Sequence, residues 1–401
     1  MHQRAYEGSH PWLTFRLDTA MRETPALWML LGECQAKCEH LAGVLIDPAY
    51  AAKLQVIYCA RGASASTQIE GNPLTEEQAL AAIEHRLHLP AAQAYQETEV
   101  MNIVNACNEF LAELERGDRP AITYQRISDL NRKVLNQIPN TDDNVVPGEI
   151  SRRGVVVGDG IYRGAPREDC KFLLDQMCAF LNGYQFDMPD SATIARAILQ
   201  AIVAHLYLAW IHPFGDGNGR TARLLEVQIL LASGAPAPAA HLLNTHYNQT
   251  RDAYYRTLRD SSAHGGDIRS FILYALRGLV EGLANQLAEV GEYQRDVIWR
   301  DYVNNRFVEI EGKPAIRQQR LLLILSGFQG PILPSKLRSQ SPHAKALYAQ
   351  FDQKTLTRDI NTLKQMGFLR QSPGGLIVDK DVLKAFAVRQ YPVRPTNAAV
   401  A

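Results

Sequence analysis

Residues 211–223 of this 401-residue chain read IHPFGDGNGRTAR, a polar, glycine-rich stretch between two apolar segments. Residues 193–210 are almost wholly apolar, and residues 224–231 resume the apolar spacing of a helix. The stretch therefore predicts a loop that joins two buried helices. Its three glycines allow positive φ angles and let backbone N–H groups point inward. A helix that begins near Gly219 directs its positive N-terminal end into this loop, which favours an anion site.

The side chains of this loop suit phosphate chemistry. His212 can act as a base near neutral pH, and Asp216 is a hard oxygen ligand suited to Mg²⁺. Asn218 can donate a hydrogen bond to a phosphate oxygen. Arg220 and Arg223 lie three residues apart, on one side of the first helical turn, where both can bind phosphates.

The same stretch resembles the signature of Fic proteins (filamentation induced by cAMP), His-x-Phe-x-Asp/Glu-Gly-Asn-Gly-Arg-x-x-Arg, and all eight specified positions match. The family transfers AMP from ATP to a hydroxyl side chain of a target protein. The resemblance implies that His212 is the catalytic base and that Asp216 holds Mg²⁺. The implied ATP- and phosphate-binding residues of the loop are Gly215, Asp216, Gly217, Asn218, Gly219, Arg220 and Arg223. The alternative is a capped loop between core helices with an incidental histidine.

A second informative stretch, residues 66–71, reads STQIEG and ends a predicted helix. Ser66 and Glu70 are four residues apart and share one helix face. A glutamate in the last turn opposes the helix dipole, so a distant cation would explain its presence. The pattern resembles the inhibitory motif of Fic proteins, Ser/Thr-x-x-x-Glu-Gly/Asn, which implies that Glu70 pairs with Arg223 and prevents productive binding of the ATP γ-phosphate. The alternative is an exposed glutamate beside Gly71 as a helix cap.

A short hairpin is predicted where residues 141–167 lose the helical period. Residues 155–158 read VVVG and are followed by a tight turn at 159–160 and a second strand. The hairpin resembles the Fic flap, which covers the active site and aligns the target segment by strand addition. This resemblance places Val156 and Val157 beside the bound nucleotide. An ordinary surface hairpin is the alternative.

Two tyrosines follow the signature on a predicted helix over residues 248–259. Tyr254 and Tyr255 resemble the adenine-contacting pair of the family, and aromatic faces stack well on a purine. The alternative is a pair of tyrosines packed against the core. Some relatives place an asparagine seven residues after the second tyrosine, where this chain has Ser262, which leaves the adenosine contact open.

Composition indicates a soluble globular protein, with 46% hydrophobic and 21% charged residues. No apolar run reaches the length of a membrane span, and the first residues lack the apolar region of a signal peptide. The six cysteines show no Cys-x-x-Cys metal spacing, and Cys34 and Cys38 fall four apart on a packed helix face. We therefore expect a reducing cytoplasm and no membrane partner.

Charge is unevenly spread although the net charge is zero. From residue 315 to the end there are 13 Lys and Arg, four Asp and no Glu, whereas residues 1–314 carry 29 basic and 38 acidic residues. The C-terminal part therefore has a charge of +9 and the remainder −9. This contrast indicates that the C-terminal part has a different partner.

The basic C-terminal part ends in a predicted helix over residues 354–366 and a hairpin that turns at residues 374–375. Within the helix, Leu356, Ile360 and Leu363 form an apolar face. The residues left largely outside are Thr357, Arg358, Asn361 and Lys364. Two helices followed by a glycine hairpin resemble a winged helix, and the basic excess suits phosphate contacts. A protein-docking or dimerising domain is the alternative, and DNA, a protein partner and a homodimer all stay open.

The expected fold is mainly α. Helices are predicted over residues 25–42, 48–69, 75–86, 91–116, 124–138, 169–182, 193–210, 219–233, 248–259, 267–299 and 315–326. The expected domains are an N-terminal helical region with the inhibitory motif at 1–118, a Fic-type catalytic core with its flap at 119–300, and a winged-helix domain at 315–390. We take the boundary before this last domain from the Gly312-Lys313-Pro314 break.

The Fic resemblance implies a protein adenylyltransferase that uses ATP and Mg²⁺. It moves AMP to a Ser, Thr or Tyr hydroxyl of a target protein, with the chain itself among the candidate targets, and Glu70 inhibits it. Three alternatives stay open. Some relatives use the same loop to transfer phosphate or phosphocholine, and some remove AMP by using the inhibitory glutamate to activate water. The third alternative is a DNA-binding regulator whose Fic core senses nucleotide.

Overall fold

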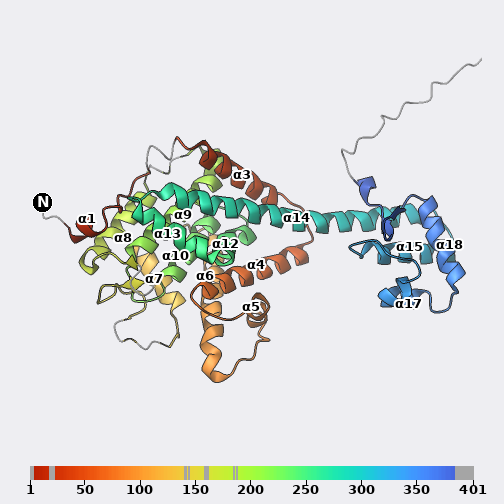
Figure 1. The fold of residues 1–401 in the computed structure, drawn as a ribbon, viewed down its shortest axis with the longest axis horizontal. Helices are drawn as coiled ribbons and strands as arrows, with labels where there is room; N and C mark the ends of the chain where they lie inside the picture. The colour runs from red at the N-terminus through yellow and green to blue at the C-terminus, as the bar shows by residue number, and fades with distance from the viewer. Residues whose placement is uncertain are drawn as a thin grey trace, which may run out of the picture. The chain divides into compact units, whose positions relative to one another are not determined.

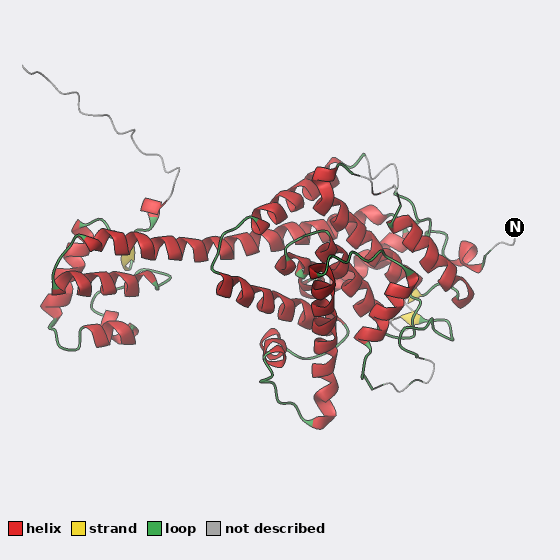
Figure 2. Ribbon diagram, turned by 180° about the vertical axis from the view of Figure 1, so that it is seen from behind, coloured by secondary structure: helices red, strands yellow, loops and turns green. Residues whose placement is uncertain are grey.

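The computed structural model describes residues 4–17, 23–139, 142, 145–157, 162–183, 186 and 188–383. The chain divides into two compact units, Met1–Ala288 and Glu289–Ala401 (Figure 1). Figure 2 shows that helices dominate, and the strands in the described parts are short. The mainly α fold is as predicted.

The first unit is built from helices. Their bounds are α1 (Ala5–Ser9), α3 (Pro25–Ala42), α4 (Pro48–Ile69), α5 (Glu76–Ile83), α6 (Ala94–Glu115), α7 (Tyr124–Val134), α8 (Arg167–Leu181), α9 (Thr193–Ile211), α10 (Asn218–Ala232), α11 (Ala237–Ala240), α12 (Leu242–Gln249), α13 (Arg251–Ala263) and the first part of α14 (Ile268–Val308). Single 3₁₀ turns at Ala91–Gln93 and Asp190–Ala192 precede α6 and α9.

The core of this unit surrounds the pair α9 and α10. Helices α3 and α8 pack against α9, while α4, α6 and α7 pack against α10. By length and composition alone the segment Asp190–Ile211 could span a membrane, but most of it is buried inside the first unit. Such burial is typical of the central helix of a globular core, and it leaves the loop between α9 and α10 anchored at both ends.

Helix ends follow the local signals in the sequence. Thr75 and Gln78 form a capping box at the start of α5, since each side chain bonds to the backbone N–H of the other residue. Asp47 caps α4 by accepting hydrogen bonds from the first-turn N–H groups. At its other end α4 stops at Ile69, as predicted, where the following Gly71 has a φ of 99°.

Some elements differ from the expectation. The first 24 residues showed no period, yet α1 forms and the Tyr6 N–H donates to the Asp169 carboxylate at 2.9 Å. The proline-rich stretch after residue 235 forms a short helix, α11, because proline is well accommodated in a first helical turn. The predicted helix over 248–259 is divided between α12 and α13.

The predicted hairpin forms from β1 (Val156–Val157) and β2 (Tyr162–Arg163). The two strands are antiparallel, with Val156 opposite Arg163 and Val157 opposite Tyr162. The tight turn expected at 159–160 lies outside the described residues. The hairpin is therefore present with the pairing that its β-branched residues favour.

The second unit has its own core. Its elements are the end of α14, α15 (Lys313–Ser326), α16 (Leu337–Gln340), α17 (Pro342–Leu347), α18 (Gln353–Gln365), β3 (Leu369–Ser372), β4 (Gly375–Val378) and a 3₁₀ turn (Asp381–Leu383). Strands β3 and β4 form the expected hairpin, and Ile332 bridges to Leu376 beside it. Leu356, Ile360 and Leu363 of α18 are buried, as predicted. The winged-helix assignment itself stays a prediction.

The division between the units falls inside α14 rather than at the Gly312-Lys313-Pro314 break. Helix α14 continues to Val308, past the predicted end at Trp299. Its last turns supply Trp299, Val303 and Phe307 to the core of the second unit. These apolar residues belong to the second unit because they bury their surface there.

Candidate active site

His212 directly follows α9 in a strained conformation. Its φ of 49° and ψ of 56° place it in the left-handed region, which is uncommon for residues other than glycine. The Nδ1 atom lies 3.2 Å from the carbonyl oxygen of Ala209. A proton on Nδ1 that donates to this carbonyl leaves the lone pair on Nε2. The ring therefore presents a base to the space beside the loop.

The surroundings of His212 favour the neutral ring. Burial lowers the pKa of His212, and this effect exceeds the opposing influence of the Ala209 carbonyl and of the Glu70 and Asp216 carboxylates. A lowered pKa keeps the imidazole unprotonated at neutral pH. That is the form which can accept a proton from a hydroxyl group.

Asn218 shapes the loop from within. Its Oδ1 accepts a hydrogen bond from the Phe214 N–H at 2.9 Å, and its Nδ2 donates to the Phe214 carbonyl at 2.7 Å. We expected this side chain to donate to a phosphate, but the loop itself uses both ends of the amide. Nδ2 carries a second hydrogen that can donate to a phosphate, so this contact stays a prediction, and backbone N–H groups can bind the anion beside it.

The N-terminus of α10 provides those N–H groups. Gly217 precedes the helix with a φ of 74°, a left-handed conformation that glycine adopts without strain. The N–H groups of residues 218–220 lie in the first turn, where a helix offers them no internal acceptor. Together with the helix dipole they form an anion site. Gly215 lies earlier in the loop against Val145, where an added Cβ would meet the valine side chain at 2.9 Å.

Asn131 of α7 binds the loop through its side-chain amide. It was not identified from the sequence. It is fully buried, and its Nδ2 donates to the Asp216 carbonyl at 2.9 Å and to Thr221 Oγ1 at 3.1 Å. Its Oδ1 accepts from the Gly148 N–H at 2.8 Å. The one signal in the sequence is an amide on the apolar face of a helix. Burial of an amide requires such partners.

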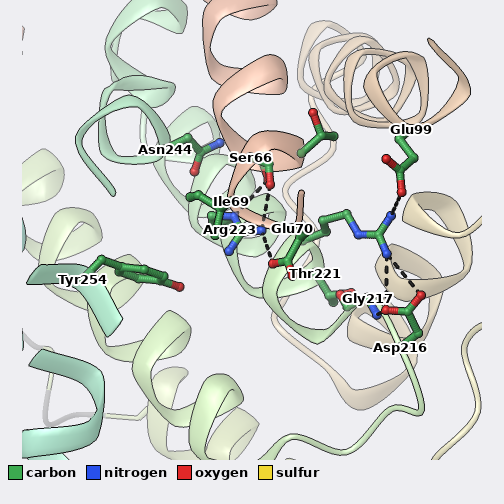
Figure 3. A network of polar contacts seen from close by, with 12 residues as sticks. Ser66, Ile69, Glu70, Glu99, Asp216, Gly217, Thr221, Arg223, Asn244 and Tyr254 are labelled. Carbon is green, nitrogen blue, oxygen red and sulfur yellow. Dashed lines mark hydrogen bonds and ion pairs between the residues drawn. The ribbon is translucent and has the colours of Figure 1, made fainter. Parts of the chain in front are cut away.

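Arg223 and Glu70 are in contact, as Figure 3 shows. The Arg223 side chain is 1% exposed, and its Nη2 donates to Glu70 Oε1 at 2.6 Å. Its Nε donates to Ser66 Oγ at 3.0 Å, and Nη2 also donates to the Ser66 carbonyl at 2.9 Å. The structure thus brings together the end of α4 and the first turns of α10.

The Glu70 carboxylate also lies over the anion site. A Cβ added to Gly219 would overlap Glu70 Oε1, so the absence of a side chain at position 219 makes room for this carboxylate. Burial alone would raise the pKa of Glu70, but the charge and hydrogen bond of Arg223 outweigh it and lower the pKa. An ionised carboxylate of the chain therefore occupies the space at the N-terminus of α10.

Arg220 is paired with two other carboxylates (Figure 3). Its Nη1 donates to Glu99 Oε1 at 2.6 Å, and its Nη2 lies 3.2 Å from Asp216 Oδ2. Asn72, two residues after Glu70, donates to the other oxygen of Glu99 at 2.8 Å. Glu99 on α6 gave no signal in the sequence. The predicted phosphate contact of Arg220 would require an exchange of these partners.

The Asp216 carboxylate is suited to a magnesium ion. Its side chain is 55% exposed, beside the N-terminus of α10. Within the described ranges no group of three His, Cys, Asp or Glu side chains could hold a metal by itself. Mg²⁺ is commonly bound by one or two carboxylates together with substrate phosphates and water. A single exposed carboxylate therefore fits this ion, and Asp216 would hold it.

The hairpin is fastened to the signature on both sides of His212. The Ser151 N–H donates to the Pro213 carbonyl at 2.8 Å, and the Ala165 N–H donates to the Ile211 carbonyl at 3.0 Å. Val156 is half exposed on β1, and the Tyr162 hydroxyl donates to the backbone of α9. These contacts place the hairpin beside the proposed base, as expected for a flap.

The two tyrosines of α13 differ in exposure. Tyr254 is 2% exposed, its hydroxyl lies 2.8 Å from His205 Nε2, and its ring stacks on Tyr247 with centroids 4.8 Å apart. Its ring faces are therefore part of the core, which agrees with the core-packing alternative. Tyr255 is 43% exposed, and its hydroxyl donates to the Ile69 carbonyl at the end of α4. Tyr255 thus stays a candidate for the purine contact.

Known proteins are similar to this chain in sequence and in fold. Residues 121–230 match the Fic/DOC family. The protein adenylyltransferase Fic of Drosophila melanogaster is 31% identical over 209 residues, which cover 52% of this chain and 38% of that protein. The protein of the same name from Aedes aegypti is 29% identical over 209 residues, which again cover 52% of this chain and 38% of that protein. The matched region thus spans less than two fifths of the length of these curated relatives.

Solved structures agree on the fold. A Fic family protein from Desulfovibrio desulfuricans G20 has a TM-score of 0.55 at 18% identity and covers 88% of this chain and 92% of that chain. Fic-1 from C. elegans has a TM-score of 0.51 at 24% identity, with 66% of this chain and 73% of that chain covered. The signature loop, the helices around it and these matches converge on one assignment. Residues 121–230 are thus similar to the Fic/DOC family, in a fold that solved Fic proteins share.

Proposed function

We propose that this chain is a protein adenylyltransferase which moves AMP from ATP to a hydroxyl side chain of a target protein and is inhibited by Glu70. The observation that carries the proposal is the anion site at the N-terminus of α10 beside His212 Nε2. A candidate base and a candidate phosphate-binding site on one loop support this reaction. The adenylyltransferases that are similar to this chain in sequence support the same reaction.

In the proposed reaction His212 Nε2 accepts the proton of the target hydroxyl. The hydroxyl oxygen attacks the α-phosphorus, a P–O bond forms, and the bond to the β-phosphate oxygen breaks, so that pyrophosphate leaves. The N–H groups of residues 218–220 stabilise the charge on the phosphates without having to reorient. Mg²⁺ at Asp216 would offset further negative charge when it is bound.

The hairpin would position the target. Val156 is half exposed on a short strand of a two-stranded sheet. An extended segment of the target can add to such a strand through backbone hydrogen bonds, and these are independent of the target sequence. Both ends of the hairpin are held by the signature segment, so the added segment would lie near His212.

The proposed inhibition follows from charge and space. Glu70 occupies the position over Gly219 and binds Arg223, which would otherwise be available to a phosphate. Two anions cannot share this site without strong repulsion. Nucleotide bound with Glu70 in place would therefore have its terminal phosphates displaced, and its α-phosphorus would not align with the target hydroxyl.

The test compares two labels. The Glu70→Gly protein is incubated with ATP labelled at either the α- or the γ-phosphate, and protein-bound label is counted. Label from the α position alone supports AMP transfer, whereas label from the γ position alone would show phosphate transfer and refute the proposal. Release of AMP from a modified target by the wild-type protein, without any transfer, would favour AMP removal.

We also propose DNA as the partner of the second unit, because of one feature of α18. The carboxylate of this helix, Asp359, is 1% exposed and binds Arg317, Gln318 and Tyr348. The outer face of α18 therefore carries no carboxylate of this helix. That face lines an open groove of about 470 Å³, formed by Gln353, Lys354, Thr357, Arg358, Asn361, Thr362 and Gln365.

Such a face suits a duplex. Lysine and arginine neutralise phosphates, and asparagine can pair with the edge of adenine in the major groove. The proposal is tested by titrating the chain with a mixture of random-sequence duplexes at low salt. Binding that depends on the second unit supports it, and the absence of binding would leave protein docking as the role of the domain.

A further inference from the structure

A second cluster of reactive groups lies apart from the signature loop. Cys59 on α4, Cys107 on α6 and His241 between α11 and α12 line one pocket of about 270 Å³. The other residues that line it are Ala52, Gln55, Val56, Ile83, Val104, Asn108, Leu111, Leu231 and Ala237. Most of this lining is apolar, so two thiols and an imidazole converge in a small cavity of low polarity.

The three groups differ in how accessible they are. Cys59 is half-buried, whereas Cys107 is 1% and His241 4% exposed. All six cysteines are free thiols. The Nδ1 atom of His241 is buried and makes no hydrogen bond within the described parts of the chain. A small reagent that enters from solvent would therefore meet Cys59 before the more deeply buried Cys107 of the same pocket.

The environment activates one of the thiols. Hydrogen bonding to Cys107 lowers the pKa of the Cys59 thiol, burial opposes this effect, and the neighbouring His241 lowers the pKa further. The same hydrogen bond and burial raise the pKa of Cys107. The other close pair behaves differently, because burial raises the pKa of Cys34 and raises that of Cys38 to about 12. Since the thiolate is the reactive form, these directions favour Cys59 as the attacking thiol of its pair.

We propose that Cys59 and Cys107 form a peroxide-sensitive thiol pair that closes to a disulfide between α4 and α6. The Cys59 sulfur attacks hydrogen peroxide, an S–O bond forms, and the O–O bond breaks to release water and a sulfenic acid. The Cys107 sulfur then attacks the Cys59 sulfur. The S–S bond forms, the S–O bond breaks, and the hydroxide leaves as water with the Cys107 proton. The two sulfurs together lose two electrons, and the peroxide is reduced to two waters.

The position of the disulfide would affect the signature loop. This effect rests on the proposed function. Cys59 lies on the helix that ends at Glu70, the partner of Arg223. Cys107 lies on the helix that carries Glu99, the partner of Arg220. The disulfide would join the two helices that keep both signature arginines paired. Oxidation would therefore retain Glu70 in the anion site and lower the rate of AMP transfer.

The thiol chemistry is tested without nucleotide. The reduced protein is treated with an equimolar amount of hydrogen peroxide, blocked with iodoacetamide, digested and analysed by mass spectrometry. A peptide that joins Cys59 to Cys107 is expected, while Cys34 and Cys38 stay reduced and serve as the internal control. Absence of the cross-linked peptide, or equal oxidation of both pairs, would overturn the proposal.

Two variants separate the roles within the cluster. Cys107→Ser should accumulate a sulfenic acid at Cys59 that a cyclic 1,3-diketone probe labels, because the resolving thiol is gone. His241→Gln should raise the pH midpoint of Cys59 alkylation by iodoacetamide, whereas the midpoint of the unaltered protein lies below the usual 8.5 or so. A midpoint that His241→Gln leaves unchanged would remove His241 from the proposal.

The effect on inhibition is measured with α-labelled ATP. Oxidation should lower the residual transfer by the wild type at least about fivefold, a reducing agent should restore it, and Glu70→Gly should be insensitive. Equal loss in both proteins would show that the disulfide acts on the site rather than through Glu70, and would overturn this consequence. Absence of any transfer by reduced Glu70→Gly would instead contradict the adenylyltransferase proposal, while the cross-linking result would stand.

Discussion

In the proposed reaction, His212 acts through the ring nitrogen that makes no hydrogen bond to the described residues. Its Nδ1 is directed at the Ala209 carbonyl, so Nε2 is the atom available to a hydroxyl group. We expect His212→Ala to lower transfer by about 10²–10⁴-fold, as is typical when a general base is lost, and to leave ATP binding largely intact. Transfer from α-labelled ATP and ATP affinity are measured on the same protein. His264→Ala is the control, since this exposed histidine bonds only to the Asp260 carbonyl of its own helix among the described residues. Transfer by His212→Ala near the parent rate would contradict the mechanism.

The pH dependence should report the same residue. Burial lowers the pKa of His212, and the reaction uses the unprotonated ring, so the active form persists below the usual histidine pKa of about 6.5. The transfer rate of Glu70→Gly should therefore rise with pH, reach its plateau near neutral pH and fall to half at a pH below about 6.5. The measurement is kcat/KM between pH 4.5 and 8.5. A half-maximum above 6.5 would mean that the ring is protonated more easily than its burial allows.

Asp216 is the one carboxylate of the signature loop. Asp216→Ala in the Glu70→Gly background should therefore lose the dependence of transfer on Mg²⁺ together with most of the activity. Asp260→Ala is a matched control, because this exposed aspartate pairs with a neighbouring arginine of α13. A variant without Asp216 that keeps full, metal-dependent activity would remove the magnesium assignment. Persistence of Glu70→Gly activity in excess chelator would do the same.

At the scale of elements, the end of α4 contacts the first turns of α10 through Glu70 and Arg223. Glu70→Gly frees Arg223 and the space over Gly219, so self-modification should rise by about 5- to 150-fold, which corresponds to a coupling of about 1–3 kcal/mol. The double variant Glu70→Gly/Arg223→Ala should lose this gain. AMP-modified residues are counted by mass spectrometry in the single, double and wild-type proteins.

The matched control for this series is Glu77→Gly, which makes the same change at an exposed residue of α5. It should behave as the wild type. Equal modification of the wild type and Glu70→Gly would mean that Glu70 only ends a helix and does not inhibit transfer. Lower accumulation of AMP in the wild type, with faster loss of AMP from a modified target, would instead support AMP removal.

Elements and site residues differed in how far the sequence could predict them. The bounds of α4 and α5 follow from signals within a few residues, such as the Thr75 capping box and Gly71. Glu99 and Asn131 contact the signature from 121 and 85 residues away in the chain, so no local pattern marks Glu99, and Asn131 is marked only as an amide on the apolar face of its helix. Asn218 was identified, but its use of both amide ends within the loop depends on how the loop closes.

At the scale of the whole molecule, the two units have separate cores. The first unit takes in both the predicted N-terminal region and most of the catalytic core, because α4 and α6 pack directly on α10. The periodicity of the sequence could not show this, since packing partners depend on tertiary contacts. The charge contrast along the chain did identify the second unit as distinct, although its core begins earlier, inside α14.

The second unit should bind duplex DNA with strong salt dependence. If Arg358 and Lys364 of α18 contact phosphates, each replacement by alanine should weaken binding and reduce the slope of log affinity against log salt by about one. Lys345→Ala removes the same charge from α17 and should have a smaller effect. Affinity is measured from 50 to 300 mM salt or so. Binding that does not respond to salt, or equal effects of all three variants, would contradict a phosphate-contacting α18.

In the proposed inhibition, the carboxylate over Gly219 is a competitive ligand that the chain itself supplies. Because Glu70 is covalently part of the molecule, its effective concentration at the site is set by geometry and does not change with dilution. Inhibition should therefore be the same in a cell that holds a few copies of the protein as in one that holds many. No separate inhibitor has to be made in proportion to the enzyme, and each new copy is folded in the restrained state.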